Sequence, residues 1–473
     1  MNILILINNA PGYIIFLKKM GDFFKKQGHI VIYACESHLP EIKYTTPLSI
    51  EEKYYFTQHV KKANNEELIE YEKMTNLRKF YYSCFDRNFH YNVNHDKDKE
   101  MDSTILRLLD YYGNIFKKHN IDLVLYENVS NSFAYAAYMV AKKNKKKYFG
   151  LITSRIPNRY EIWEDEYGNI DKRKENFEEL NIDSIPLNDK DYIIKYLESV
   201  HLNKAMPDYM INNPMNIKIN YFYYYLKKIH VFNRYIEYYL KYPEDVKGAY
   251  QSAYPIKASY KFVMRNLKRK LKISLLKKMY DSFEFSKEKF FLLPLHYQPE
   301  SSTSVNAMYY DNQYEFVKNV AFSLPIGISL FVKDHPNGIG FADLDFYKKI
   351  KRLPNVKYIN PLSDTKELIN NSKGVITLTS TMGYEALLLE KPVITLGKVF
   401  YNYHPYCYNI SGYNELYDTV RKVLSQEHKD FMQHNLKFLY IYYNDTYEGK
   451  VFNKESNFSD IYNSIITKMG KNI

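Results

Sequence analysis

The sequence predicts an α/β protein built from two parallel-sheet domains. At 473 residues the chain is too long for one ordinary hydrophobic core, and its hydrophobic content of 45% is enough for two. In both halves, short apolar runs rich in Ile, Val and Leu alternate with segments of helical periodicity. Strands that are apolar on both faces and alternate with helices are typical of parallel sheets covered on both sides.

The first half begins with the apolar run 3–7, a loop at 8–13 and a helical pattern that ends at Gly28. We expect strands at 3–7, 29–34, 123–126 and 147–152, and helices at 14–27, 102–119 and 132–143. The polar segment 49–101 is predicted to be a mostly helical insertion. The loop after the first strand lacks the G-x-G-x-x-G pattern, which argues against dinucleotide binding.

The second half repeats the alternation. Strands are expected at 290–295, 328–332, 356–359, 375–378 and 393–396, with helices at 312–322, 365–370, 383–389 and 414–424. We predict domains at 1–196 and 290–424, a basic helical insertion at 197–289, and C-terminal helices at 425–473 that pack back on the first domain. Such sheets bind ligands at the carboxyl ends of their strands, so a cleft between the domains is the expected site.

The net charge and the cysteine content of the chain indicate which kind of partner it binds and in which compartment it lies. The formal net charge of +12 favours an anionic partner such as a nucleotide, an acidic glycan or a membrane surface. Cys35, Cys84 and Cys407 are far apart, which argues against a disulfide framework or a zinc site and indicates a reducing cytoplasm. No apolar run reaches the roughly 18–20 residues that cross a bilayer, and the N-terminal run is too short for a secretory signal.

The segment 261–278, KFVMRNLKRKLKISLLKK, carries eight basic residues and no acidic one. Val263, Leu267, Leu271 and Leu275 recur at four-residue spacing, which predicts an amphipathic basic helix. Two interpretations stay open: a surface helix packed on its own domain, or a helix that contacts anionic lipid at the inner face of the membrane. Nucleic-acid binding is disfavoured because no recognition fold accompanies the basic helix.

The most informative segment is 375–396, which has the pattern of a strand, a polar turn, a helix and a second strand. Ser380 and Thr381 fall where the helix begins, with Gly383 and Glu385 in its first turn. Unpaired backbone N–H groups and the helix dipole make a helix start an anion site, so these residues are a candidate phosphate site. The structural alternatives are a plain helix cap for Ser380 and a solvent-facing position for Glu385.

Two other strand ends carry polar side chains. The strand at 328–332 ends in KDHP, in which Lys333 and His335 can donate hydrogen bonds to a phosphate. The strand at 290–295 is followed by His296, Gln298 and Glu300. A carboxylate on a strand-end loop can act as a base or a nucleophile, and the alternative for Glu300 is a helix cap.

Together, HYQPESST (296–303), KDHP (333–336) and TSTMGYEALLLEKPVITLG (379–397) resemble, in order and spacing, the bacterial capsule polysaccharide biosynthesis family. That family includes β-Kdo transferases, which have the GT-B fold and use CMP-activated Kdo. The resemblance is specific across 290–401 and weaker at YENVSNS (126–132) and SRIPNR (154–159). No family motif falls in 197–289.

The resemblance implies roles for individual residues. His335 would contact the phosphate of the sugar donor or the sugar carboxylate. Ser380 and Thr381 would hold the phosphate at the helix start, and Glu385 would bind the ribose hydroxyls.

Glu300 stands where Kdo transferases of the family carry an Asp that is proposed as the nucleophile, in a segment where His296 replaces a Gln. This departure leaves open whether the sugar is Kdo and whether the anomeric configuration is retained. Glu127, after the strand at 123–126, is a candidate base on the acceptor side, and a buried structural carboxylate is the alternative.

We therefore predict a cytoplasmic glycosyltransferase that moves Kdo or a related acidic sugar from a CMP donor to a capsule polysaccharide or glycolipid. Domain 1–196 would face the acceptor and domain 290–424 would bind the nucleotide sugar. No cofactor or metal is expected, because the Asp343-Leu344-Asp345 pattern lies well past its strand end. The alternatives are a CDP-polyol phosphotransferase of the teichoic-acid type and a non-catalytic glycan assembly subunit.

Overall fold

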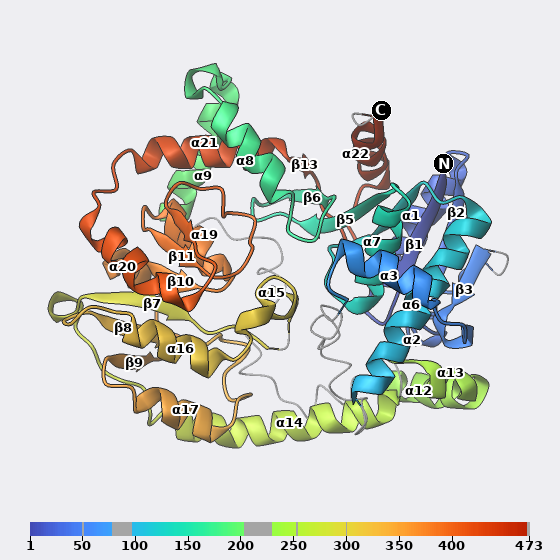
Figure 1. The fold of residues 1–473 in the computed structure, drawn as a ribbon, viewed down its shortest axis with the longest axis horizontal. Helices are drawn as coiled ribbons and strands as arrows, with labels where there is room; N and C mark the ends of the chain where they lie inside the picture. Colours follow the sequence, from blue (N-terminus) through green and yellow to red (C-terminus); the bar gives the residue numbers. More distant parts are fainter. Residues whose placement is uncertain (50–51, 78–96, 203–228, 252–253, 299, 471–473) are drawn as a thin grey trace. The chain divides into compact units, whose positions relative to one another are not determined.

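The computed structural model describes residues 1–49, 52–77, 97–202, 229–251, 254–298 and 300–470 (Figure 1). The chain divides into two compact units. The first consists of Met1–Glu166, Ile219–Phe262 and Thr446–Ile473, and the second of Tyr167–Lys218 and Val263–Asp445. Each unit is built on one sheet whose strands are mainly or wholly parallel, so the predicted class of two parallel-sheet α/β domains is confirmed.

The first unit contains a seven-stranded sheet with the order β13-β6-β5-β4-β1-β2-β3. Its strands are β1 (Asn2–Ile7), β2 (Ile30–Cys35), β3 (Lys53–Tyr55), β4 (Leu123–Glu127), β5 (Lys147–Thr153), β6 (Arg159–Trp163) and β13 (Thr446–Glu448). β1 to β5 pair in parallel, whereas β6 runs antiparallel to β5 and to β13. The apolar run that predicted β1 is buried throughout, as expected for a central strand covered on both faces.

Helices surround this sheet. They are α1 (Tyr13–Lys26), α2 (Leu39–Tyr44), α3 (Asn65–Met74), α6 (Lys97–His119), α7 (Ser132–Lys143), α12 (Ile229–Lys241), α13 (Pro243–Gly248) and α22 (Phe458–Gly470), with a 3₁₀ turn η2 (Phe56–Gln58). A small apolar cluster of Leu39, Tyr238 and Val246 joins α2 to α12 and α13. The predicted helical insertion at 49–101 is wrong in its first part, which contains β3, and its residues 50–51 and 78–96 lie outside the described residues.

The second unit contains a six-stranded sheet with the order β12-β11-β10-β7-β8-β9. Its strands are β7 (Phe290–Pro294), β8 (Ser329–Lys333), β9 (Val356–Ile359), β10 (Val375–Thr377), β11 (Val393–Thr395) and β12 (Cys407–Asn409). Every neighbouring pair is parallel. The five strands predicted in this half are confirmed, and β12 is an additional edge strand.

The helices of the second unit follow the βα pattern. They are α8 (Ile170–Glu179), α9 (Leu187–His201), α14 (Pro255–Leu276), α15 (Ser301–Ser304), α16 (Gln313–Phe322), α17 (Leu344–Lys351), α18 (Thr365–Asn371), α19 (Thr381–Leu388), α20 (Leu416–Ser425) and α21 (Phe431–Asn444). Shorter 3₁₀ turns are η3 (Ile182–Ser184), η5 (Phe285–Lys287), η6 (Met308–Tyr310) and η7 (Tyr413–Glu415). The first residues of α14 belong to the first unit and the rest to the second.

The division of the chain differs from the predicted domain boundaries. Residues 167–196, predicted in the first domain, belong to the second unit, as do residues 425–445. The predicted insertion at 197–289 is shared between the units, and its residues 203–228 and 252–253 lie outside the described residues. Thr446–Ile473 belong to the first unit, where β13 pairs with β6.

Each sheet has one point at which the chain reverses the direction of strand addition. In the first unit β1 lies between β2 and β4, and in the second β7 lies between β8 and β10. The loops that leave two such strands diverge to opposite faces, and the crevice at their carboxyl ends is where open α/β sheets bind ligands. These two edges are therefore the places to look for sites.

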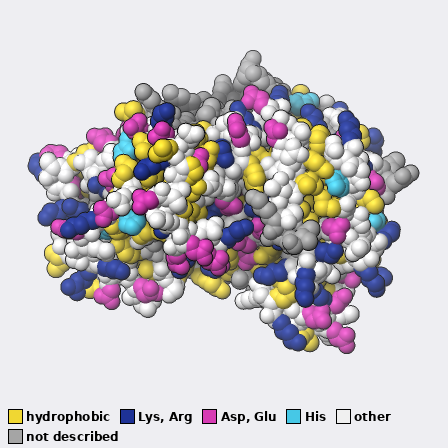
Figure 2. Space-filling view, turned by 90° about the horizontal axis from the view of Figure 1, so that it is seen from above, with side chains coloured by type: hydrophobic (Ala, Val, Ile, Leu, Met, Phe, Trp, Pro, Cys, Tyr) yellow, Lys and Arg dark blue, Asp and Glu magenta, His cyan; other side chains and the backbone are white. Residues whose placement is uncertain are grey.

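Two features concern the predicted anionic and membrane partners: the distribution of charge on the surface and the length of the apolar stretches in the helices. On the face drawn in Figure 2, basic and acidic side chains are interspersed. No helix within the described residues has an apolar stretch long enough to cross a bilayer.

Candidate functional site

The carboxyl ends of β7 and β10 are joined by hydrogen bonds at the reversal point of the second sheet. Thr377, the last residue of β10, lies with Oγ1 at 3.3 Å from Nε2 of His296, which follows β7. The same hydroxyl oxygen accepts the backbone N–H of Ser380 at 3.2 Å. Two of the three segments singled out in the sequence therefore meet through Thr377, a residue that was not predicted. The signal for it was a polar residue at the end of an apolar strand.

His296 is almost fully buried, with 8% of its surface exposed. Its backbone N–H donates to Gln313 Oε1 at 2.5 Å, and Gln313 Nε2 donates to its carbonyl at 3.1 Å. Burial, together with the nearby His335, lowers the pKa of His296 to about 3. The ring is therefore neutral at physiological pH, so His296 positions the β10 loop and offers no positive charge to a phosphate.

Gln298 is bonded within its own loop. Its Nε2 donates to the carbonyl of Asp311 at 2.7 Å, and its Oε1 accepts from Gln313 Nε2 at 2.9 Å. Both the nitrogen and the oxygen of the Gln298 amide are therefore hydrogen-bonded. The partner of the oxygen, Gln313, is the first residue of α16. The contacts make Gln298 a brace of its own loop, and its predicted role as a nucleotide ligand stays a prediction.

Lys333 also differs from its predicted role. Its side chain is 3% exposed, and Nζ donates to the carbonyl of Pro361, after β9, at 2.7 Å. Burial lowers the pKa of this ammonium to about 8, while the carboxylate of Glu385 opposes the shift. Lys333 is thus a buried cation whose charge interacts with Glu385, and its predicted contact with a phosphate stays a prediction.

Asp334, the residue before the His-Pro turn that follows β8, is anchored by two buried tyrosine hydroxyls. The Asp334 carboxylate is buried and accepts the hydroxyls of Tyr347 at 3.1 Å and Tyr358 at 3.2 Å. Burial raises its pKa to about 6. His335 is half-buried, and its Nδ1 accepts the backbone N–H of Asn337 at 3.1 Å. In the neutral ring the proton therefore lies on Nε2, which makes that atom a hydrogen-bond donor.

The start of α19 has the expected cap. Ser380 precedes the helix, and its Oγ accepts the backbone N–H of Met382 at 3.2 Å, while Thr381 is the first helical residue and is half-buried. The hydroxyl of Tyr401 donates to the Ser380 carbonyl at 2.6 Å. The helix start is thereby fixed in position before any ligand binds.

Two further residues of α19 were predicted to bind the nucleotide. Gly383 is buried, and its backbone N–H donates to the Ser380 carbonyl at 3.0 Å. A Cβ atom there would come within 2.8 Å of Tyr401 Cζ, so Gly383 gives room to Tyr401, and its predicted ligand role stays a prediction. Glu385 is half-buried, and its negative charge raises the pKa values of Lys333 and Lys366 against the effect of burial.

Glu300 begins the short helix α15, yet its side chain does not cap the backbone of that helix. The Oγ of Ser302 donates to its carboxylate at 3.3 Å. Thr379 Oγ1 donates to the carbonyl of Ser302 at 2.7 Å, which ties this loop to the residue before Ser380. The structure thus joins Glu300 to the same edge, although Pro299 before it lies outside the described residues.

Glu127 is separate from this group because it lies in the first unit. It is the last residue of β4, and its carboxylate accepts Ser130 Oγ at 2.7 Å. It stands at the carboxyl edge of the first sheet, next to β1. The predicted role as an acceptor-side base stays a prediction.

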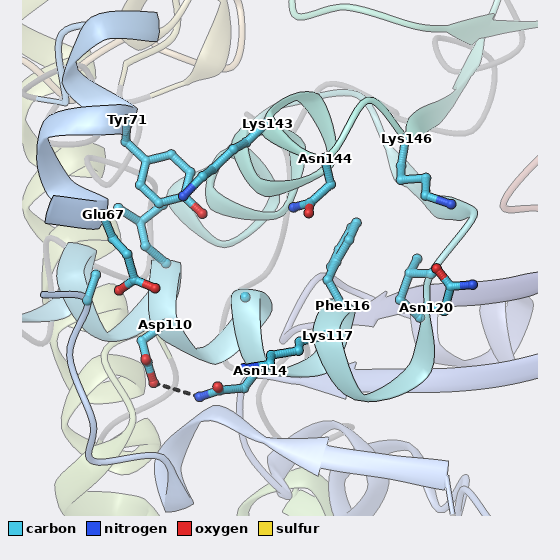
Figure 3. A pocket seen from close by; sticks show the side chains of 14 residues that line it. Glu67, Tyr71, Asp110, Asn114, Phe116, Lys117, Asn120, Lys143, Asn144 and Lys146 are labelled. Carbon is cyan, nitrogen blue, oxygen red and sulfur yellow. Dashed lines mark hydrogen bonds between the residues drawn. The ribbon is translucent and has the colours of Figure 1, made fainter.

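A cavity of about 590 Å³ lies elsewhere in the first unit, between α3, α6 and the end of α7 (Figure 3). Its wall is mainly polar and includes Glu67, Asp110, Lys117 and Lys146. None of the residues predicted as catalytic or ligand-binding lines it. The cavity therefore does not mark the candidate site.

Residues 220–443 match the family described as "Capsule polysaccharide biosynthesis protein". The match starts well before the HYQPESST motif, so it also covers α12, α13 and α14, in which the sequence motifs gave no sign of the family. A stretch of 95 residues is 39% identical to protein FixF of Sinorhizobium fredii (strain NBRC 101917 / NGR234). That stretch spans 19% of this chain and 21% of FixF.

Solved structures give distant likenesses. The KpsC β-Kdo 2,4 transferase of Thermosulfurimonas dismutans is 13% identical, with 68% of this chain and 80% of that chain covered and a TM-score of 0.35. The UDP-GlcNAc 2-epimerase of Methanocaldococcus jannaschii in complex with UDP-GlcNAc and UDP is 11% identical, with 91% and 94% covered and a TM-score of 0.31.

Proposed function

We propose that the chain, whose residues 220–443 match the capsule polysaccharide biosynthesis family, is a glycosyltransferase of surface polysaccharide synthesis. The proposed sugar donor is CMP-activated Kdo or a related acidic sugar, and the proposed acceptor is a growing capsule polysaccharide or glycolipid. The observation that carries the proposal is the bonded junction of His296, Thr377 and Ser380 at the reversal point of the second sheet. Ligands of open α/β sheets bind at this kind of edge.

The proposed phosphate position lies at the start of α19. A helix start offers backbone N–H groups and a partial positive charge, and Thr381 adds a hydroxyl. His335 would donate from Nε2, because its Nδ1 is already an acceptor. When the bond between sugar and phosphate breaks, negative charge grows on the phosphate, and fixed donors there stabilise the transition state.

Two carboxylates complete the proposed site. Glu385 follows Thr381 by one helical turn and would accept the ribose hydroxyls. Glu300 would face the sugar as nucleophile or base, with its carboxylate held by the hydrogen bond from Ser302 Oγ.

We also propose that α14 contacts anionic lipid. Leu267, Leu271 and Leu275 are 47%, 74% and 51% exposed and lie on one side of the helix. Exposed lysines flank them, namely Lys268, Lys270, Lys277 and Lys278. The opposite side is anchored by buried Arg269, whose Nε donates to the Ile339 carbonyl at 2.6 Å. An apolar stripe bordered by Lys is the surface that interfacial helices present to anionic lipid.

The decisive experiment has two steps on the purified full-length protein. Thermal unfolding with CMP, CDP, UDP and GDP identifies the nucleotide, because a ligand at a hundred times its Kd adds about 2.7 kcal/mol of stability. We expect CMP to stabilise the wild type, His335→Ala to remove the effect, and the exposed His230→Ala on α12 to retain it. Stabilisation by UDP alone would contradict the proposed donor.

The second step is product analysis. Mass spectrometry of the product formed from a CMP-sugar and a surface-glycan acceptor should show the mass of one added glycosyl residue. A phosphodiester in the product would instead support the CDP-polyol phosphotransferase. Unchanged transfer by both Glu300→Gln and His335→Ala would support a non-catalytic assembly role for this edge.

A further inference from the structure

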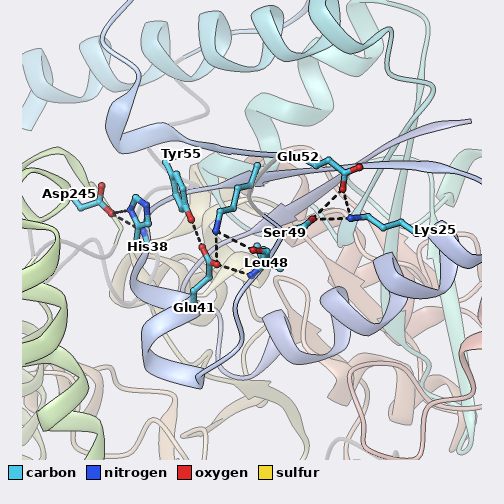
Figure 4. Close-up of polar contacts among 9 residues, drawn as sticks. Lys25, His38, Glu41, Leu48, Ser49, Glu52, Tyr55 and Asp245 are labelled. Carbon is cyan, nitrogen blue, oxygen red and sulfur yellow. Dashed lines mark hydrogen bonds and ion pairs between the residues drawn. The ribbon is translucent and has the colours of Figure 1, made fainter.

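A His–Asp pair in the first unit carries a second inference (Figure 4). His38 Nδ1 lies 2.7 Å from Oδ2 of Asp245, which is only 4% exposed. The same carboxylate accepts the backbone N–H of His38 at 2.8 Å and Thr57 Oγ1 at 2.5 Å. Three donors from two residues, His38 and Thr57, therefore fix Asp245, and Asp245 in turn fixes one nitrogen of the imidazole.

Two tyrosine rings fix the plane of the imidazole. The centroid of Tyr55 lies 3.5 Å from that of His38 with an interplanar angle of 21°, and the centroid of Tyr242 lies 4.0 Å away at 15°. With Nδ1–H donating to Asp245, the neutral ring has its lone pair on Nε2. Nε2 makes no hydrogen bond within the described part of the chain, and the side chain stays 12% exposed.

The pair lies at the carboxyl edge of the first sheet. His38 is the third residue after β2 and precedes α2. On α2, Lys43 Nζ donates to Asn9 Oδ1 in the loop after β1 at 3.0 Å. Hence His38 belongs to the same edge as the loop after β1, beside the reversal point between β1 and β4.

We propose that His38 is the catalytic base that accepts the proton of the acceptor hydroxyl and that Asp245 is its positioning residue. This inference rests on the proposed function and assigns acceptor activation to a residue of the first unit. An imidazole oriented by a carboxylate, with the other nitrogen available, is the arrangement by which enzymes activate hydroxyl groups.

The transfer step balances as follows. The acceptor O–H proton moves to His38 Nε2 as the acceptor oxygen forms a bond to the anomeric carbon. The bond between that carbon and its leaving group breaks, and the electron pair goes to the leaving group. In a direct displacement the leaving group is the nucleotide phosphate. In a double displacement it is the carboxylate that held the sugar.

Packing alone does not explain the imidazole. Asp245 ties its three segments together through the backbone N–H of His38 and the hydroxyl of Thr57, neither of which needs the ring. Between two tyrosine faces an apolar ring would pack without the cost of desolvating a second nitrogen. The proposed base function gives a reason for a polar ring at this position.

The test compares full-length wild type, His38→Ala, Asp245→Asn and a matched control, His59→Ala. The control removes another His–Asp pair of the first unit, in which His59 Nε2 lies 2.6 Å from Asp110 and the side chains are similarly buried. A general base contributes about 10²–10⁴-fold to a rate, so we expect His38→Ala to lose transfer by that factor. We expect CMP binding and thermal unfolding to stay near wild type and His59→Ala to stay active.

Two readouts separate a base from a merely structural residue. Imidazole in the buffer should partly restore transfer by His38→Ala, since it can enter the gap between Tyr55 and Tyr242. If the imidazole is the base, the rate of the wild type should depend on pH and His38→Ala should lose that dependence. Asp245, Tyr55 and Tyr242 contact the imidazole, and the charged or titratable groups that act on Tyr55 or on Cys35 next to it are Glu36, Glu41, Lys53 and Asp245.

The outcomes are distinct. An active wild type with an equally active His38→Ala would overturn the base assignment and leave the proposed function intact. If His38→Ala unfolds, the test rests on the Asp245→Asn variant. An unchanged rate and pH profile in that variant would overturn the inference. A wild type that transfers no sugar from any CMP, CDP, UDP or GDP donor would overturn the proposed function and this inference together.

Discussion

The position of Tyr401 over Gly383 gives a quantitative prediction for the start of α19. In Gly383→Ala the new Cβ would clash with the Tyr401 hydroxyl and lie within 2.8 Å of its Cζ. Tyr401 must then move, and its hydrogen bond to the Ser380 carbonyl, 2.6 Å long, is lost. The cap that fixes the proposed phosphate site would be released as a result.

The expected cost follows from three terms. Overpacking a filled site costs about 1–3 kcal/mol, and loss of one hydrogen bond costs about 0.5–1.5 kcal/mol. Replacing Gly by Ala in a helix returns about 1 kcal/mol. We therefore expect Gly383→Ala to lower the free energy of unfolding by roughly 0.5–3.5 kcal/mol.

Urea unfolding followed by far-UV circular dichroism measures this change, and nucleotide titration measures its effect on the site. The matched control is Gly113→Ala in α6, where a Cβ meets nothing within 4 Å and the backbone is helical. That substitution should leave stability unchanged or raise it slightly. In a Tyr401→Phe background the nearest clashing atom and the hydrogen bond are already absent, so Gly383→Ala should cost less there.

A result in which Gly383→Ala is as harmless as Gly113→Ala would refute the assigned packing role. Full additivity with Tyr401→Phe would refute the proposed coupling between the two residues. In either case only the first interpretation of Gly383 would remain, as part of the candidate phosphate site at the helix start.

Three further predictions concern charge and surface. Because burial raises the pKa of Asp334 to about 6, the folded state holds more protons than the unfolded chain between about pH 4 and 6. Wild-type stability should fall relative to Asp334→Asn as pH rises through that window, measured by urea unfolding at each pH. Burial lowers the pKa of Lys333 to about 8, so the unfolded chain holds more protons between pH 8 and about 10. Wild-type stability should rise with pH there relative to Lys333→Met, and equal slopes would contradict the assignment. Replacing Leu267, Leu271 and Leu275 by Gln should abolish sedimentation with phosphatidylglycerol vesicles, whereas Leu187→Gln, which changes a leucine that is 77% exposed, should not. Retention of binding by the triple variant would count against a lipid-facing α14.

The central strands could be predicted because their signal is local. β1, β7 and β8 are continuous apolar runs flanked by polar turns, and the structure buries them as expected. The strands at the two ends of the first sheet, β3 on one side and β6 and β13 on the other, were missed because they are short and contain polar residues. Their pairing depends on distant partners: Arg159 of β6 donates from Nε to Thr446 Oγ1 at 2.6 Å across 287 residues. No local pattern contains such a pairing.

The candidate site was predictable to a similar extent. The residue types at the strand ends indicated phosphate chemistry, and Ser380 caps α19 as expected. The internal partners of these side chains could not be predicted: Lys333 and Gln298 donate to backbone carbonyls that lie far from them or in a neighbouring loop. His38 and Asp245 stand 207 residues apart, and only the fold brings them together.

Each sheet has a buried, hydrogen-bonded polar pair at its reversal point, and this likeness supports the interpretation of both edges as ligand sites. In the first unit Tyr126, on β4, donates its hydroxyl to Oδ1 of the buried Asn8 after β1. In the second, Thr377 on β10 meets the buried His296 after β7. A buried polar pair gains about 1 kcal/mol at most from its hydrogen bond and loses far more if one partner is removed, so apolar residues would serve stability as well at lower risk. Such pairs at both crevices hold the strand-end loops in place while leaving polar atoms at the edge, which is what recognition of a hydroxyl-rich, charged substrate requires.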